Sequence, residues 1–212
     1  MANAREIQNR IKSIQDTRKI TNAMYLISST KLKKSRKLLE DTEPYFYTLQ
    51  SLIRRILRHM GDTEHPYFNA RKEIKEENRI RGLVVITGDK GLAGAYNHNV
   101  LKMAQEWMEQ SKNHRLYVVG ELGRHYFEAR HIQVEEQFHY TVQNPTMHRA
   151  RLISSTILED YEEGRLDEVW IIYTQMINSM QMEAEMTALL PLKREDFSNI
   201  VIPADIIQEE IQ

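Results

Sequence analysis

The opening segment of the chain constrains the fold most, because more than forty residues pass without a proline or a glycine. The first proline is Pro44 and the first glycine is Gly61. Since these two residues are the strongest helix breakers, the segment predicts a long helix over residues 3–58. At about 1.5 Å per residue this helix would extend roughly 80 Å, and we expect any break at Thr42–Pro44.

Apolar residues in this segment follow a coiled-coil spacing. The spacing of four and three residues occurs in Ile7, Ile11 and Ile14 and, after a slip, in Ile20, Met24 and Ile27. A single narrow apolar stripe does not stabilise a lone helix, so we expect a second helix to pack against it. The middle of the segment carries small and cationic side chains where a strong zipper has Leu or Ile. It is therefore predicted to face a partner.

The distribution of charge separates the two parts of the chain. Residues 1–60 hold 13 Lys and Arg against 5 Asp and Glu, a balance of +8, whereas residues 61–212 hold 16 against 25, a balance of −9. The basic cluster that includes Lys31, Lys33 and Lys34 could contact phosphates of a nucleic acid, but the chain as a whole is not basic. We expect an acidic protein surface as its target, with a solvated helix face as the alternative.

Composition excludes several classes of function. The 212 residues include no cysteine, so a disulfide framework, a thiolate nucleophile and a cysteine-ligated metal are ruled out. No apolar run approaches the roughly 20 residues of a membrane span. His125 and His131 are six residues apart and do not form a His-Glu-x-x-His motif, and no Gly-x-Ser-x-Gly elbow occurs. We therefore expect no metal site and no catalytic residues.

The second part of the chain predicts an α/β domain. The expected strands are 82–87, 115–119, 131–134, 168–174 and 181–190, and the expected helices are 97–111, 122–130 and 145–163. Strands that alternate with helices at this spacing are typical of a Rossmann-like layered domain with a mostly parallel sheet. The predicted organisation is a helical coiled-coil arm over 1–60, a connector over 61–81 and the α/β domain over 82–212.

Three glycines lie between the first expected strand and the helix that follows, within Thr87–Asn97. The spacing Gly-x-x-Gly-x-x-Gly differs from the dinucleotide fingerprint, and the last glycine is followed by Ala95 and Tyr96 instead of the Lys and Ser/Thr of a phosphate loop. We expect a structural turn without a cofactor, in which Asp89 and Lys90 are candidate protein contacts.

Segments in the same order along most of the chain resemble the F-type ATP synthase gamma subunit family. They are residues 4–7, 10–14, 17–24 and 29–32 in the opening helix, residues 86–97 in the glycine loop, and residues 172–174 and 189–192 near the end. One such motif would be weak, but several in register are specific.

The resemblance implies a non-catalytic rotor subunit in the central stalk of a proton-translocating ATP synthase. In that family the first helix turns inside a hexamer of alpha and beta subunits, and the α/β domain contacts the epsilon subunit and the membrane ring of c subunits. Met24, Lys31, Lys33 and Lys34 would face acidic regions of beta. The resemblance places the chain at the cytoplasmic face of a bacterial plasma membrane, in contact with the membrane only through the complex.

The sequence departs from this family at its end. Gamma subunits have a second long helix that pairs with the first, whereas this sequence stops at Gln212, shortly after the apolar residues at 206–211, with no second long stripe. The sequence is therefore either a fragment or a C-terminally shortened homologue, and we expect the opening helix to self-associate when the chain is isolated. The alternative function is a stand-alone α/β protein-binding module with a coiled-coil arm.

Overall fold

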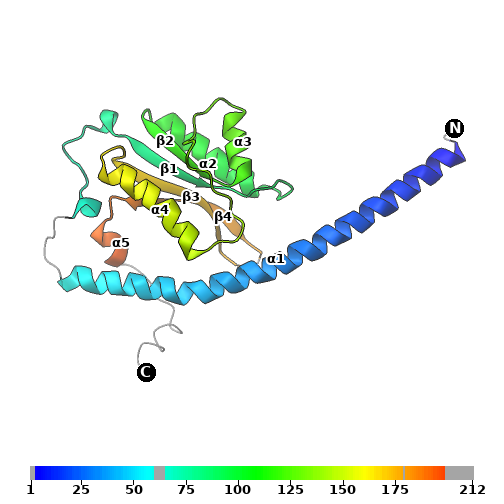
Figure 1. The fold of residues 1–212 in the computed structure, drawn as a ribbon, viewed down its shortest axis with the longest axis horizontal. Helices are drawn as coiled ribbons and strands as arrows, with labels where there is room; N and C mark the ends of the chain where they lie inside the picture. The colour runs from blue at the N-terminus through cyan, green and yellow to red at the C-terminus, as the bar shows by residue number, and fades with distance from the viewer. Residues whose placement is uncertain (1–2, 60–64, 179, 199–212) are drawn as a thin grey trace, which may run out of the picture. The chain divides into compact units, whose positions relative to one another are not determined.

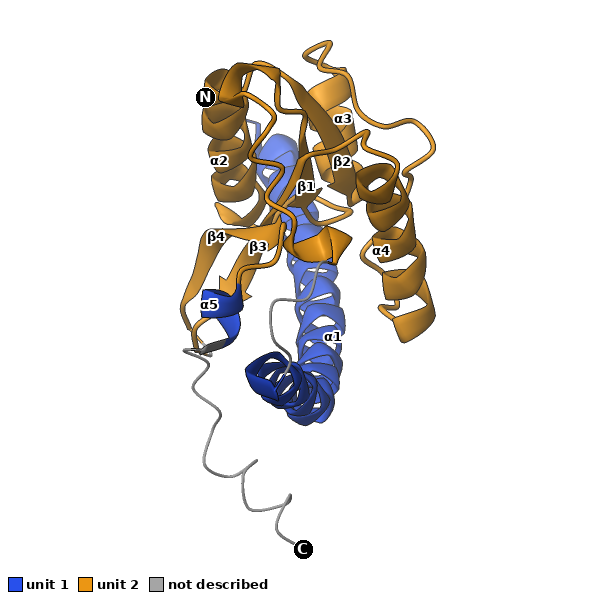
Figure 2. Ribbon diagram, turned by 90° about the vertical axis from the view of Figure 1, so that its left-hand side faces the viewer, with its two compact units in different colours: residues 1–61, 194–212 blue, residues 62–193 orange. Residues whose placement is uncertain are grey.

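A computed structural model describes residues 3–59, 65–178 and 180–198 of the chain. The chain divides into two compact units, one formed by residues 1–61 and 194–212 and the other by residues 62–193 (Figure 2). Residues 206–211, near which the sequence stops, lie outside the described residues.

The first unit contains the predicted long helix. Helix α1 runs over Ala4–His59, 56 residues, and α5 is a short helix over Arg194–Ser198 (Figure 1). The break expected at Thr42–Pro44 is wrong, because α1 continues through Pro44. Proline removes one backbone hydrogen bond, to the carbonyl of Glu40, but the chain stays helical on both sides of Pro44.

The second unit is built on a four-stranded sheet, which confirms the predicted fold class. Its strands are β1 (Arg81–Ile86), β2 (His114–Val119), β3 (Glu168–Met176) and β4 (Met182–Leu190), in the order β2-β1-β3-β4. Strand β1 is parallel to both β2 and β3, and β4 is antiparallel to β3. The crossover helices are α2 (Tyr96–Gln110), α3 (Glu121–Glu128) and α4 (Met147–Glu162).

Helices cover both faces of this sheet, so the central strands are apolar on both sides. Alternate residues of a strand point to opposite faces. Leu83 and Val85 of β1 belong to a core cluster with α2 and α3, whereas Val84 belongs to a second cluster with α4. This double burial explains why the sequence of β1 is a continuous apolar run.

The segment between α3 and α4 differs from its prediction. Residues 131–134 were expected to form a strand, but His131, whose φ is 56°, ends a turn that follows α3, and residues 132–134 have no regular secondary structure. Only scattered bonds join the following residues to the edge of β2: the Glu135 N–H donates to the Leu116 carbonyl, and Tyr140 forms a single bridge with Val119. Helix α4 then begins after Thr146, whose hydroxyl oxygen accepts from the Arg149 N–H at 3.2 Å and caps the helix.

Two short 3-10 turns occur in the described part of the expected connector, at Pro66–Phe68 and Glu76–Asn78. Between them, Arg71 donates to Asp167 Oδ1 at 2.9 Å and to the carbonyl oxygens of Leu166 and Tyr161. Its guanidinium also lies 4.4 Å from the centre of the Tyr161 ring. The largely buried Arg71 thus helps to hold residues 65–81 against the residues just before β3 and the end of α4.

Candidate protein interface

Helix α1 presents its apolar side chains at the surface. No residue of Ala4–His59 is buried, and the exposed side chains include Ile14 at 68% and Met24 at 48%. Exposed apolar residues that repeat at helical spacing mark a surface made for a protein partner. Three surface ion pairs, such as Arg10–Glu6, support the helix itself and contribute a few tenths of a kcal/mol each.

The two apolar groups of α1 lie on different sides of the helix. At about 100° per residue, the step from Ile14 to Ile20 turns the stripe, and the centre of the second group lies about 140° around the helix from the first. The first face consists of Ile7, Ile11 and Ile14, and the second of Ile20, Met24 and Ile27. The helix therefore has two apolar faces for partners. The spacing of the apolar residues predicts a single stripe instead.

Two of the three predicted lysines lie on the second face. Lys31 and Lys34 continue the second face beyond Met24 and Ile27, whereas Lys33 points about 150° away from it. All three lysines are exposed, and none of their ammonium groups has an ion-pair partner among the residues that the structure describes. The second face thus combines an apolar stretch with a cationic end.

The loop between β1 and α2 is shaped by side chains at its base. The Gly88 N–H donates to Asn97 Oδ1 at 2.7 Å, and the buried Thr87 hydroxyl accepts from the Gly123 N–H at 3.0 Å. Gly120, with φ 103°, lies so close to Thr87 that a methyl group at its Cα would overlap the Thr87 carbonyl oxygen. These contacts fix the start of the loop against α3, which agrees with the predicted structural turn.

The two candidate residues of this loop have different surroundings. Asp89 Oδ1 accepts from the Glu121 N–H, at the first turn of α3, and from the Val142 N–H, both at 3.2 Å. Lys90 is exposed, and so is Leu92, at 95% with a φ of 61°. Asp89 therefore holds the loop to its own unit, and the side chains displayed to solvent are those of residues 90–95.

In the described ranges, no three His, Cys, Asp or Glu side chains gather closely enough to share a metal ion. Over the same ranges, no helix has both the length and the hydropathy of a bilayer-crossing segment. The arrangement defines a class of protein: an α/β unit joined to a long helix whose apolar side chains are exposed.

Comparison with known proteins identifies the family to which this chain belongs. The family model described as ATP synthase matches residues 3–211. The ATP synthase gamma chain of Acetivibrio thermocellus is 44% identical over 193 residues, and that of Caldanaerobacter subterraneus is 39% identical over 206 residues. A sodium ion specific ATP synthase gamma chain of Acetobacterium woodii is 36% identical over 194 residues. The chain belongs to the family of ATP synthase gamma chains, and the predicted resemblance is confirmed.

The alignments cover more of this chain than of its relatives. They include 91% of this chain and 65% of the Acetivibrio thermocellus protein, and 97% and 69% for Caldanaerobacter subterraneus. Among solved structures, a chain in the central stalk and c-ring of the Tetrahymena thermophila mitochondrial ATP synthase is similar to this chain, with a TM-score of 0.56 and 17% sequence identity. The match covers 91% of this chain and 84% of that chain. This likeness shows the same fold.

Proposed function

We propose that the chain is a central-stalk rotor subunit of an ion-translocating F-type ATP synthase. In this role it couples rotation of the membrane ring to the synthesis and hydrolysis of ATP in a hexamer of alpha and beta subunits. It contributes no catalytic residues and needs no cofactor. The observation that carries the proposal is α1, whose two apolar faces are both exposed in a chain that belongs to the gamma family.

The two faces of α1 suit two different neighbours. The first face, with Ile7, Ile11 and Ile14, has the heptad spacing that packs against another helix. The second face, which ends in Lys31 and Lys34, suits apolar and acidic side chains of the surrounding alpha and beta subunits. The balance of +8 in residues 1–60 supports an acidic surface as the target.

We assign the remaining contacts to the α/β unit. The exposed part of the glycine loop, with Lys90, contacts a neighbouring subunit, and the rest of the unit meets the epsilon subunit and the ring of c subunits. The chain is then a peripheral component at the cytoplasmic face of a bacterial plasma membrane. The family match favours this function over a stand-alone binding module.

Assembly with purified alpha and beta subunits tests the proposal. The chain should co-elute with them in size-exclusion chromatography. The single substitutions Lys31→Glu and Lys34→Glu should each weaken the complex about tenfold or more. Lys33→Glu is the matched control, because it makes the same charge change on another side of the helix. Failure of the unaltered chain to co-elute would favour the stand-alone module, and equal effects of all three substitutions would contradict the assignment of faces.

A further inference from the structure

A charged pocket lies in the α/β unit at the amino ends of β1 and β2, the opposite end of these strands from the glycine loop. Its cavity volume is about 420 Å³, within the range of small-molecule sites. The charged residues that line it are Lys75, Glu76, Glu77, Arg79, Arg81 and Lys112. Four cations therefore face two carboxylates.

Two arginines form the floor of this pocket and share a buried partner. Glu168 Oε1 lies 3.1 Å from Arg79 Nη1, and its Oε2 lies 3.0 Å from Arg81 Nε. The three side chains are largely buried, at 11% exposed for Arg79, 16% for Arg81 and 17% for Glu168. One carboxylate thus faces two guanidinium groups, which leaves one positive charge to be balanced from the pocket side.

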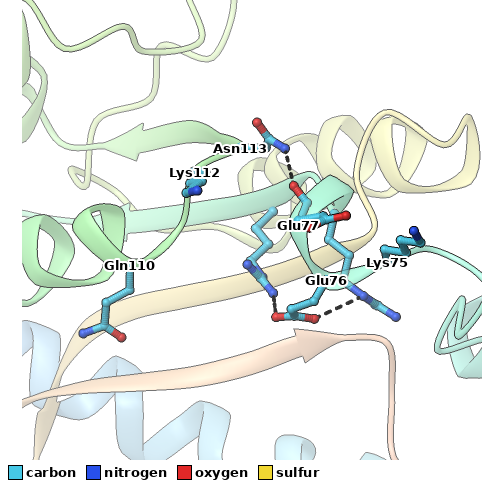
Figure 3. A pocket seen from close by; sticks show the side chains of 8 residues that line it. Lys75, Glu76, Glu77, Gln110, Lys112 and Asn113 are labelled. Carbon is cyan, nitrogen blue, oxygen red and sulfur yellow. Dashed lines mark hydrogen bonds and ion pairs between the residues drawn. The ribbon is translucent and has the colours of Figure 1, made fainter.

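The solvent-exposed carboxylate of Glu76 balances this positive charge. Its carboxylate contacts Arg79 Nε at 3.5 Å and also the Arg81 guanidinium, although 77% of the Glu76 side chain is exposed. Figure 3 shows this carboxylate at the centre of the pocket, with a dashed line on each side. Because water solvates the exposed Glu76 carboxylate well, these ion pairs contribute less free energy than pairs in which both partners are buried. The Glu76 carboxylate is therefore in a position from which a stronger anion can displace it.

Once the Glu76 carboxylate leaves the pocket, the lining residues carry more positive than negative charge. Lys75 and Lys112 are exposed at its edge, and in the described parts of the chain neither ammonium has an ion-pair partner. Guanidinium groups bind planar and tetrahedral oxyanions through paired N–H donors, and lysines add charge without a fixed geometry. The four cations together match a small anion with several negative oxygens.

We propose that this pocket is a binding site for a multivalent oxyanion of the phosphate class, and that Glu76 occupies the place of the ligand when the ligand is absent. The anion takes the two guanidinium contacts of Glu76 and gains the charges of Lys75 and Lys112. Glu168 remains in place and keeps both arginines oriented. This site shares no residue with the two faces of α1 or with the glycine loop, and the proposal does not rest on the rotor function.

Titration of the full chain with pyrophosphate by isothermal calorimetry, at low salt, tests the site. Glu76→Gln should tighten binding about tenfold, because it removes the competing charge and keeps the shape of the side chain. The matched control is Glu77→Gln, one residue away in the same pocket, which should change the affinity about twofold or less. Lys112→Gln should weaken binding, and the Arg81 Nε–H signal in an NMR spectrum should shift on addition of pyrophosphate.

Citrate at the same concentration and pH serves as a carboxylate probe of similar charge, and it should bind more weakly than pyrophosphate. The proposal is overturned if Glu76→Gln binds no pyrophosphate, or if the two Gln substitutions strengthen binding equally. Equal binding of citrate would also overturn it, because the pocket would then respond to charge alone. Thermal unfolding of each variant checks that the fold is retained.

Discussion

At the scale of single residues, Gly120 has the least freedom to change. Its φ of 103° is unfavourable for any side chain, and a Cβ would overlap the backbone of Thr87. Gly120→Ala should lower the free energy of unfolding by about 3 kcal/mol or more, measured by urea denaturation. Gly94→Ala is the control, since Gly94 also has a positive φ, 57°, but open space around it. Its cost should be about 1 kcal/mol, and equal costs would contradict the packing described here.

Tyr117 gives the stability of the α/β unit a dependence on alkaline pH. Burial, and then its hydrogen bond to Asp160, raise the pKa of the Tyr117 phenol well above its usual value near 10. The unfolded chain therefore loses this proton at a lower pH than the folded chain. The stabilisation is complete below about pH 10 and is lost as the pH rises above that value.

The expected slope is up to about 1.4 kcal/mol in unfolding free energy per pH unit for this residue above pH 10. Tyr117→Phe should reduce the slope, whereas Tyr25→Phe, at an exposed position of α1, should leave it unchanged. Urea denaturation between pH 9 and pH 11 measures both. An identical slope in the Tyr117→Phe variant would show that the phenol does not carry the effect.

At the scale of elements, Asp89 joins the glycine loop to α3. Because Asp89 Oδ1 accepts from the Glu121 and Val142 N–H groups, Asp89→Ala should cost about 1–2 kcal/mol of unfolding free energy. Lys90→Ala, one residue further along an exposed loop, should cost less than about 0.5 kcal/mol. Thermal unfolding with both variants in parallel makes the comparison. A larger loss for Lys90→Ala would reverse the roles assigned to these two residues.

Most elements could be predicted from the sequence, because their apolar periods are clear. The mostly parallel sheet followed from strands such as β1, whose continuous apolar run reflects burial on both faces. The path of α1 through Pro44 was not predictable from breaker residues alone, since helix formation on both sides outweighs one lost hydrogen bond. Residues 131–134 have the residue types of a strand. The sequence does not reveal the left-handed backbone of His131 or the small number of hydrogen bonds to β2, so the strand was predicted wrongly.

The candidate interface was predictable in its residues and less so in its geometry. Met24 and the lysines were found from composition and from resemblance. That Lys33 points to a different side of the helix from Met24, Lys31 and Lys34 follows only from an unbroken helix from Ile7 to Lys34. The pocket around Arg79 and Arg81 was not predictable from the sequence. Its residues are far apart in the chain, and only the parallel pairing of β1 with β3 brings Arg81 next to Glu168.

At the scale of the whole molecule, the exposed first face of α1 predicts self-association of the isolated chain. Sedimentation equilibrium should show a dimer or a higher oligomer, because burying this stripe against a second helix releases water from apolar surface. Ile7→Lys together with Ile14→Lys should shift the chain to a monomer. Leu92→Lys, at an even more exposed position outside α1, is the control and should leave the association unchanged. A monomer whose arm is fully helical by circular dichroism would contradict this prediction.

The absence of cysteine from the chain allows a direct test of the rotor proposal, because one introduced cysteine is a unique attachment point. Met24→Cys, labelled with a photoreactive maleimide and assembled with alpha and beta subunits, places a cross-linker on the second face of α1. On illumination we expect a covalent product with beta, identified by mass spectrometry. If the labelled chain instead couples only to itself, or to neither alpha nor beta, then α1 does not lie within the hexamer and the account is wrong.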